Sequence, residues 1–388
     1  MKIVDLCEFY SERGGGVRSY LDKMCKAATG TDHEVIVVAP GPEDSTTTEG
    51  QGTIIRFAAP PMPYDPTYRM PWRLDRMRSI VTKLRPDVLQ VSSPFAPAWV
   101  ARTITDVPLK TYVYHSDPIG CYVTRAAASV NFPPLTSLLH GVSWGYLRGI
   151  CNSFDATIVA GKWLEELLTE KGCRGVHTVP FGIDHADFSP EHRDLELRSR
   201  LLGPFAERPQ AKLALIGGRL AADKRQGLLL EALRLVNETQ PVAVMLLGDG
   251  PERERLEQQA RALPAFSSML FTKDRKAYAT LLASVDLVLQ GSMCETFGFF
   301  PAEALASGVP LVVPDQGGAA YLGDASCVAK YAAFGGPQAV ARAILQILGQ
   351  SSSDLRAGAL RAASGIQESA EHFQNLFRFY ETRVAKPR

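Results

Sequence analysis

Residues 294–308 read CETFGFFPAEALASG and lie between two short apolar runs, 285–289 and 309–313. Apolar runs of this length, separated by a glycine turn and a helical segment, are typical of strands in a parallel sheet. The stretch carries two carboxylates, Glu295 and Glu303. A carboxylate beside a buried strand end is costly unless hydrogen bonds satisfy it. The stretch therefore predicts an α/β fold and a site for a ligand rich in hydroxyl groups.

The same alternation of apolar runs and helical patterns extends through both halves of the chain. We expect strands at 2–6, 34–39, 53–57, 88–92, 109–114 and 156–159, then at 212–216, 242–247, 268–271, 285–289, 311–313 and 326–329. We expect helices at 17–28, 72–84, 135–152, 226–237, 252–261, 277–283, 301–306 and 369–384. Two such series predict two facing Rossmann-like, doubly wound domains with a cleft between them.

The chain of 388 residues is long enough for two cores. We place the first domain at 1–185, the second at 186–368 and a C-terminal helix, which packs back on the first domain, at 369–388. The polar segment 41–52 is expected to be a mobile loop, because it lacks apolar periodicity.

Composition narrows the class of protein. A formal net charge of +1 excludes a strongly basic nucleic-acid binder in bulk. The seven cysteines form no Cys-x-x-Cys pair, which is typical of reduced thiols in a cytoplasmic protein. The N-terminus shows no signal-peptide pattern and no run reaches the ~18 apolar residues of a membrane span. We therefore expect a cytoplasmic protein that meets a membrane, if at all, from its surface.

Two motifs in the first half follow expected strands. Gly14, Gly15 and Gly16 open a helix, where backbone N–H groups can approach a phosphate; a flexible turn is the alternative. His115 ends a strand, where its ring can exchange a hydrogen bond with a substrate hydroxyl; a structural histidine is the alternative.

Two motifs in the second half carry charge. Arg219 and Lys224 bracket a loop between a strand and a helix, which suits a diphosphate; a solvated surface pair is the alternative. Glu295 and Glu303 can each accept hydrogen bonds from a diol. An acid–base pair for hydrolysis is the competing interpretation, and the basic loop argues against it. The turn at 248–252 is expected only to shape the site, and no metal-ligand spacing occurs.

Taken together, the motifs resemble the family 4 glycosyltransferases, retaining enzymes of the GT-B fold. The resemblance covers nearly the whole chain and rests on GGGV at 14–17, HSD at 115–117, VPFGID at 179–184, GR at 218–219 with Lys224, GDGP at 248–251, ASVD at 283–286, ETFG at 295–298, SGVP at 307–310 and GG at 317–318. Departures from the commonest pattern occur at Phe181, at 225–226 and at 291–294. None of them removes a charged site residue.

The resemblance implies a role for each domain and for single residues. The first domain would bind the acceptor and the second the nucleotide-sugar donor. The catalytic residues would be His115 at the donor sugar, Arg219 and Lys224 at the leaving diphosphate, and Glu295 at the sugar hydroxyls. The donor would also contact Gly15, Gly16, Phe297, Gly298, Phe299, the ribose-binding Glu303 and, near the base, Thr272. Neither a metal ion nor another cofactor is expected.

The resemblance implies transfer of a hexose from a nucleotide sugar, with GDP-mannose as the first expectation and UDP-glucose as the alternative. The acceptor is expected to be a glycan, a lipid-linked or a cell-envelope molecule. The basic stretch 69–85 and the apolar stretch 122–147 suit either peripheral contact with the inner membrane surface or ordinary surface helices. Other GT-B-like enzymes, such as an epimerase or a phosphorylase, and a non-catalytic nucleotide-sugar sensor are the competing hypotheses.

Overall fold

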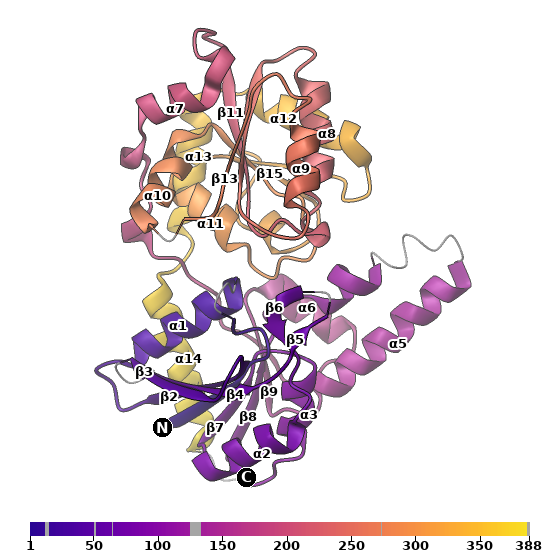
Figure 1. The fold of residues 1–388 in the computed structure, drawn as a ribbon, viewed down its shortest axis with the longest axis vertical. Helices are drawn as coiled ribbons and strands as arrows, with labels where there is room; N and C mark the ends of the chain where they lie inside the picture. The colour runs from indigo at the N-terminus through magenta and orange to yellow at the C-terminus, as the bar shows by residue number, and fades with distance from the viewer. Residues whose placement is uncertain (12–14, 50–51, 64, 125–132, 273, 386–388) are drawn as a thin grey trace. The chain divides into compact units, whose positions relative to one another are not determined.

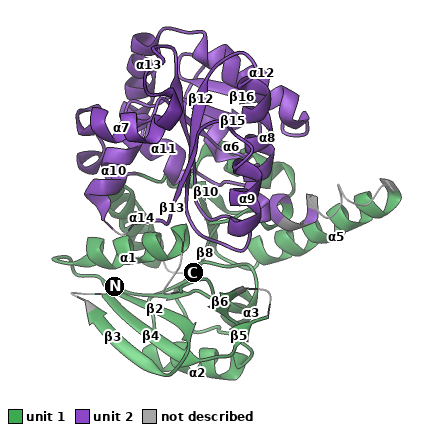
Figure 2. Ribbon diagram, turned by 45° about the horizontal axis from the view of Figure 1, so that its top comes forward, with its two compact units in different colours: residues 1–119, 126–182, 369–388 green, residues 120–125, 183–368 purple. Residues whose placement is uncertain are grey.

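The computed structural model describes residues 1–11, 15–49, 52–63, 65–124, 133–272 and 274–385. Gly14 of the predicted glycine motif, and part of the apolar stretch 122–147, lie outside these ranges. The chain divides into two compact units (Figure 2). Unit 1 comprises 1–119, 126–182 and 369–388, and unit 2 comprises 120–125 and 183–368. The binding roles predicted for the two domains stay predictions.

Unit 1 is built on an eight-stranded sheet in the order β10-β9-β8-β7-β1-β2-β4-β3. Its strands are β1 (Lys2–Leu6), β2 (Glu34–Gly41), β3 (Ser45–Glu49), β4 (Gly52–Ala58), β7 (Val88–Val91), β8 (Leu109–Val113), β9 (Ala156–Val159) and β10 (Val176–Thr178). All neighbours are parallel except β3, which pairs antiparallel with β4. A small hairpin of β5 (Pro61–Met62) and β6 (Asp65–Arg69) stands apart.

The helices of unit 1 are α1 (Gly16–Ala28), α2 (Leu74–Leu84), α3 (Ala96–Arg102), α5 (Pro133–Cys151), α6 (Lys162–Glu170) and α14 (Ser369–Val384). The chain reaches α14 from unit 2, yet the helix lies against unit 1 (Figure 2). Its buried stripe includes Phe373, Leu376 and Tyr380, which recur at helical spacing. This amphipathic pattern is why the terminal segment folds as a helix against a sheet.

Unit 2 contains a six-stranded, all-parallel sheet in the order β13-β12-β11-β14-β15-β16 (Figure 1). Its strands are β11 (Lys212–Gly217), β12 (Val242–Leu247), β13 (Phe266–Met269), β14 (Leu287–Leu289), β15 (Leu311–Pro314) and β16 (Val328–Tyr331). Its helices are α7 (Leu195–Leu202), α8 (Gln226–Val236), α9 (Arg253–Ala260), α10 (Arg275–Ser284), α11 (Phe299–Ala306), α12 (Gly336–Leu348) and α13 (Ser352–Ser364).

The alternation of side chains along β11 explains the apolar run in the sequence. Leu213 and Leu215 belong to one hydrophobic cluster, whereas Ala214 and Ile216 belong to another. Successive side chains of a strand point to opposite faces, so both faces of this sheet are buried under helices. The α/β fold class with two parallel-sheet domains is therefore confirmed.

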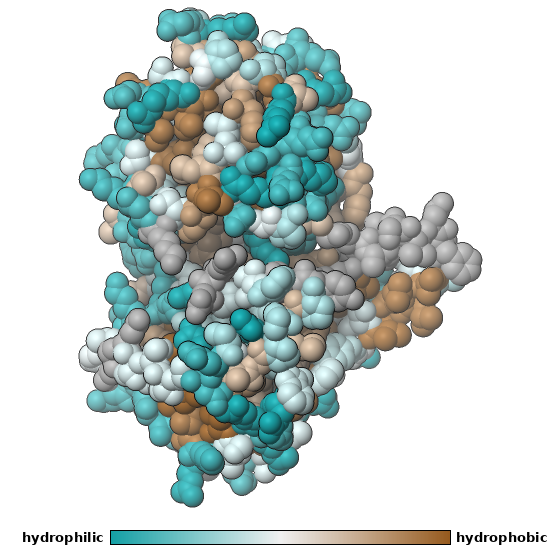
Figure 3. Space-filling model, viewed as in Figure 1, coloured by the Kyte–Doolittle hydropathy of each residue, from teal (hydrophilic) through white to brown (hydrophobic). Residues whose placement is uncertain are grey.

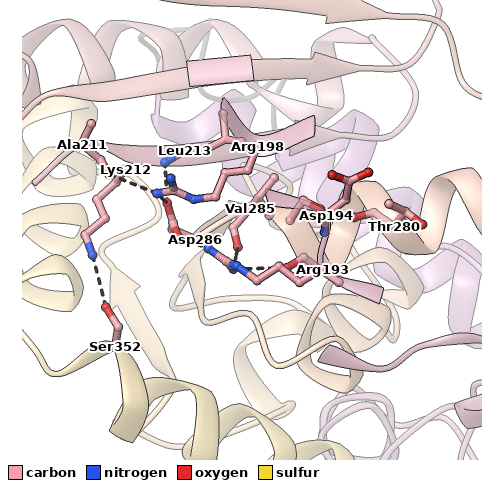
Figure 4. A network of polar contacts seen from close by, with 12 residues as sticks. Arg193, Asp194, Arg198, Ala211, Lys212, Leu213, Thr280, Val285, Asp286 and Ser352 are labelled. Atoms are coloured by element: carbon pink, nitrogen blue, oxygen red, sulfur yellow. Dashed lines mark hydrogen bonds and ion pairs between the residues drawn. The ribbon is translucent and has the colours of Figure 1, made fainter. Parts of the chain in front are cut away.

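A partly buried carboxylate fastens the amino-terminal edge of this sheet (Figure 4). Asp286, which precedes β14, pairs with Arg193 at 3.1 Å and with Arg198 at 2.7 Å. The backbone N–H of Leu213 donates to the same carboxylate at 2.9 Å. Burial acts to raise the pKa of Asp286, but the hydrogen bonds from Arg198 and its neighbours hold that pKa below its ordinary value.

One prediction for unit 1 is wrong. The polar segment 41–52 is not simply a loop, because Ser45–Glu49 forms β3 against β4. Its three consecutive threonines are β-branched and favour an extended backbone, although they carry no apolar alternation. Within the described ranges, every helix is too short or too polar to span a membrane.

Candidate active site

The strand order of unit 2 reverses at one place. The chain runs outward from β11 through β12 to β13, and then returns to place β14 on the other side of β11. In open α/β sheets, ligands bind outside the carboxyl ends of the strands at such a reversal. The loop after β11 carries Arg219 and Lys224, and the loop after β14 carries Glu295. Three predicted site residues are therefore gathered at this switch point.

The centre of this site is an ion pair between Lys224 and Glu295. Lys224 Nζ lies 2.6 Å from Glu295 Oε1 and 3.7 Å from Asp223 Oδ2. Gln290 Nε2, from the end of β14, lies 3.5 Å from the same Glu295 oxygen. The side chains of Lys224 and Glu295 remain 25% and 21% exposed, so a ligand can reach both.

The ion pair sets the charge of the lysine. Burial alone would lower the pKa of Lys224, but the adjacent carboxylates of Glu295 and Asp223 raise it above its ordinary value. The ammonium is therefore permanently charged near neutral pH. It can act as a fixed positive group but not as a general base.

Close backbone approaches hold these loops in place. A Cβ atom on Gly291 would lie 2.4 Å from the carbonyl oxygen of Lys224, so only glycine fits there. A Cβ atom on Gly248 would lie 2.0 Å from the carbonyl oxygen of Gly218, which explains the glycine turn after β12. The side chain of Gln226 donates to the carbonyl oxygen of Arg219 at 2.8 Å. Arg219 itself is exposed on this loop.

The start of α11 lies directly after Glu295. Gly298 is the residue before the helix and adopts a φ of 95°, which favours glycine. The N–H of Gly318 donates to the carbonyl oxygen of Glu295 at 2.6 Å and fixes the turn. Phe297 and Phe299 contact each other edge to face, with ring centroids 5.1 Å apart. The N–H groups at this helix start are suited to an anion or a hydroxyl oxygen.

Glu303 occupies a separate position one turn further along α11. Tyr278 OH donates to Glu303 Oε2 at 2.7 Å, and Arg275 Nη1 lies 4.0 Å from Oε1. Arg275 also pairs with Asp184 at 2.9 Å and with Asp187. Glu303 thus has protein partners of its own, and the structure does not join it directly to the Lys224–Glu295 pair.

Arg275 and Tyr278 were missed by the sequence interpretation. They lie three residues apart on α10, whose N-terminus is capped by the side chain of Asp274, which accepts from Ala277 N at 3.1 Å. The signal was present, since a capping aspartate followed by an arginine and a tyrosine places both side chains on one face. Thr272 lies just before this cap, and its hydroxyl accepts from Asp274 N at 3.0 Å.

In unit 1, His115 lies at the end of a hydrogen-bonded network of buried polar side chains. Its Nε2 lies 3.2 Å from Ser92 Oγ, and Ser92 donates to Asp5 Oδ2 at 2.7 Å. Gln90 donates to the same oxygen at 2.6 Å and accepts from Tyr380 of α14 at 2.6 Å. Because Ser92 uses its one proton toward Asp5, it accepts from His115, which places the imidazole proton on Nε2.

Burial sets the protonation states of His115 and Asp5 in this hydrogen-bonded network. It lowers the pKa of His115 from 6.5 to about 3, with a smaller contribution from His372. It raises the pKa of Asp5 from 3.8 to about 7, against hydrogen bonds from Ser92 and Gln90. His115 is therefore neutral at physiological pH, and its Nδ1 atom carries a lone pair that can accept a hydrogen bond. Asp5, Gln90 and Ser92 were missed, although a polar residue inside an apolar strand was the available signal.

Gly15 and Gly16 stand at the start of α1. Gly15 is the residue before the helix, and a Cβ atom there would meet no described atom within 4 Å. No contact with the described residues therefore requires glycine at Gly15. The predicted approach of a phosphate to this helix start stays a prediction.

Two family models match consecutive parts of the chain. The model of Glycosyltransferase Family 4 matches residues 14–187, and that of Glycosyl transferases group 1 matches residues 202–360. The curated relatives include a GDP-mannose-dependent alpha-(1-6)-phosphatidylinositol dimannoside mannosyltransferase of Mycobacterium tuberculosis. It is 28% identical over 94% of this chain and 92% of its own length. A GDP-mannose-dependent alpha-mannosyltransferase of Corynebacterium glutamicum is 25% identical over 82% and 73% of the two chains.

Among solved structures, a sucrose-phosphate synthase of Thermosynechococcus elongatus superposes with a TM-score of 0.78, covering 99% of this chain and 100% of its own. The two share 16% sequence identity, so this likeness shows the fold alone. Together with the two parallel-sheet units and the charged switch point of unit 2, the family matches confirm the resemblance seen in the sequence. The chain belongs to the family 4 glycosyltransferases of GT-B fold, and it is a glycosyltransferase.

Proposed function

We propose that this enzyme transfers mannose from GDP-mannose, with retention and without a metal ion, to a lipid-linked or other cell-envelope acceptor. The observation that carries the proposal is the Lys224–Glu295 pair at the switch point of unit 2. An ammonium for a leaving diphosphate and a carboxylate for sugar hydroxyls are the two groups that such a transfer needs in one place.

Each half of the pair has its own task. Lys224 and Arg219 neutralise the charge that develops on the diphosphate as the glycosidic bond breaks, where a fixed positive group helps most. Glu295 accepts hydrogen bonds from hydroxyls of the transferred sugar, and N–H groups at the start of α11 donate to its other oxygens. The departing phosphate serves as the base for the acceptor hydroxyl on the same face of the sugar.

The remaining residues position the donor. Glu303 accepts hydrogen bonds from the ribose diol, and the Tyr278 hydroxyl at 2.7 Å orients its carboxylate for this. Thr272 lies beside the base. His115, which is neutral, accepts a hydrogen bond from a sugar hydroxyl at Nδ1, the acceptor nitrogen of the tautomer assigned above. Gly15 and Gly16 leave the start of α1 open to the donor phosphate or the acceptor.

The donor choice rests on the curated relatives. Both relatives described above are named for GDP-mannose, and one is named for a phosphatidylinositol acceptor. These names support a mannosyl donor and a glycolipid acceptor for this chain. UDP-glucose remains the alternative donor, to be tested beside GDP-mannose.

A surface of unit 1 supports a membrane-bound acceptor. Along α5, Leu135, Leu138 and Val142 are exposed, and their spacing places them on one helix face. Figure 3 shows apolar surface gathered in this part of the molecule. The exposed fractions of Leu138 and Val142 exceed 60%. Exposed apolar side chains that cluster in this way are typical of surfaces that contact a membrane or a partner. The basic stretch is less suited, because Arg73 pairs with Asp75 and Arg76 pairs with Asp44. We therefore assign peripheral membrane contact to α5.

The test is a donor comparison with purified enzyme and membrane-lipid extract. Release of GDP from GDP-mannose, at least tenfold faster than release of UDP from UDP-glucose, is expected. The rate should persist in excess EDTA, and Glu295→Gln should abolish it. Tight donor binding by wild type without turnover of either donor, with or without extract, would instead establish a nucleotide-sugar sensor.

A further inference from the structure

Two cysteines lie beside the proposed donor site. Cys121 Sγ is 2.6 Å from Cys294 Sγ, although 173 residues separate them in the chain. Both belong to unit 2, since residues 120–125 group with it. Cys294 immediately precedes Glu295 in the sequence, so whatever happens at its sulfur acts on the loop that carries the site carboxylate.

We propose that Cys121 and Cys294 form a reversible disulfide when the protein meets a peroxide, and that this disulfide switches off sugar transfer. The chemical step does not depend on the proposed function, whereas the loss of activity does. A transient disulfide of this kind is compatible with thiols that are reduced at rest in a reducing compartment.

The surroundings of Cys294 favour it as the attacking sulfur. The hydrogen bond from Cys121 lowers the pKa of Cys294, aided by Ser292 and Lys224 and opposed by burial. Ser292 Oγ lies 3.6 Å from Cys294 Sγ. Cys294 is 6% exposed, which admits a small oxidant better than a bulky one, and Cys121 is partly exposed.

The reaction balances with hydrogen peroxide as the two-electron oxidant. The Cys294 thiolate attacks one peroxide oxygen, the O–O bond breaks, and with one proton the products are Cys294 sulfenic acid and water. The Cys121 sulfur then displaces hydroxide from the sulfenic acid, and its own proton completes a second water. The net change is two thiols and one peroxide to one disulfide and two waters.

A metal ion is the competing occupant of this cluster. One carboxylate oxygen of Asp223 lies with the two sulfurs inside a group whose atoms are all within 4.8 Å of one another. Two thiolates on one tetrahedral zinc would stand about 3.8 Å apart, given a Zn–S distance of about 2.3 Å. The two sulfurs are in direct contact at 2.6 Å, which is too close for two thiolates that share one zinc.

The first test is chemical and needs no enzyme activity. Reduced full-length protein is treated with hydrogen peroxide, its remaining thiols are alkylated, and its peptides are mapped without reduction. A linked pair of peptides holding Cys121 and Cys294 is expected. Alkylation of both cysteines after peroxide treatment, or stoichiometric zinc in the purified protein that Cys121→Ser removes, would overturn the proposal.

The second test is functional. Peroxide should lower GDP-mannose turnover at least tenfold, and dithiothreitol should restore it. Cys294→Ser should resist peroxide. Cys121→Ser should be inhibited without recovery, because the sulfenic acid then lacks a partner and oxidises further.

The matched control is Cys173→Ser. Cys173 and Cys151 make a second thiol contact, in unit 1, and both are buried. This variant should be inhibited by peroxide and restored by dithiothreitol to the same extent as wild type. Equal inhibition of Cys294→Ser and wild type would refute the switch. If no donor is turned over at all, the proposed function fails, and the peptide map still decides whether the disulfide forms.

Discussion

Replacing Lys224 by methionine tests the proposed site most directly. Methionine keeps most of the length of the side chain but removes the ammonium that lies 2.6 Å from Glu295. The substitution should change both the free energy of unfolding and kcat/KM, because the ammonium contacts a protein carboxylate in the free enzyme and the diphosphate during the reaction. They can be measured separately.

The stability change follows from the ion pair. A hydrogen bond to a charged group contributes about 1.5–3 kcal/mol, and the partial exposure of both side chains reduces this by solvent screening. We expect Lys224→Met to lower the free energy of unfolding by about 1–2 kcal/mol. Denaturant unfolding of the donor-free protein measures it. In a Glu295→Gln background, Lys224→Met should lower the free energy of unfolding by less, because the charge pair is already broken.

The activity change follows from the leaving group. Loss of one charge-assisted hydrogen bond in the transition state lowers kcat/KM by roughly 10- to 150-fold, for about 1.5–3 kcal/mol. Initial rates of GDP release, with GDP-mannose varied, measure this ratio. The control is Lys212→Met, at the opposite end of β11, whose ammonium lies 3.2 Å from Ser352 Oγ. A fall of less than threefold for Lys224→Met, or an equal fall for the control, would refute the reasoning.

Three further outcomes are expected. Asp286→Asn should lower the free energy of unfolding by about 2–4 kcal/mol, because two arginines lose a partly buried partner. Since the pKa of Asp286 is depressed, this difference should shrink as pH falls below 3.8 toward the folded-state pKa, as denaturant melts at several pH values would show. Tyr278→Phe should raise the KM for donor about tenfold with little effect on kcat, because Glu303 loses its orienting hydrogen bond; an unchanged KM would separate Glu303 from the donor. Asp5→Asn should gain stability relative to wild type as pH rises from 5 to 8, because the pKa of Asp5 is raised from 3.8 to about 7 and the wild type must ionise a buried carboxyl; a pH-independent difference would contradict this.

The fold could be read from local patterns to a large extent. The apolar runs at β1, β9 and β12 coincide with the strands, since alternation with helices requires parallel strands buried on both faces. The run at 45–48 was misread, because β-branched residues without apolar alternation can pair at a sheet edge. The strand predicted at 268–271 begins at Phe266, where pairing with β12 rather than hydrophobicity sets its start.

The site was partly foreseen. Glycine turns and charged residues directly after strands marked Lys224 and Glu295, because those positions fall at the carboxyl edge of a parallel sheet. The partners that orient them could not be foreseen. Tyr278 beside Glu303, and Ser92 between Asp5 and His115, depend on which strands and helices become neighbours.

Local sequence patterns were enough to predict the fold class, the family and the residue types at the switch point, because hydrophobic periodicity, glycine placement and motif order can be read along the chain. Which side chains come into contact depends on the three-dimensional fold. Lys224 reaches Glu295 across 71 residues, because strand order places β14 beside β11 and brings the loops after these strands to one edge. Cys121 reaches Cys294 across 173 residues. Adjacency in a sheet is set by the packing of the whole unit, which no short stretch encodes.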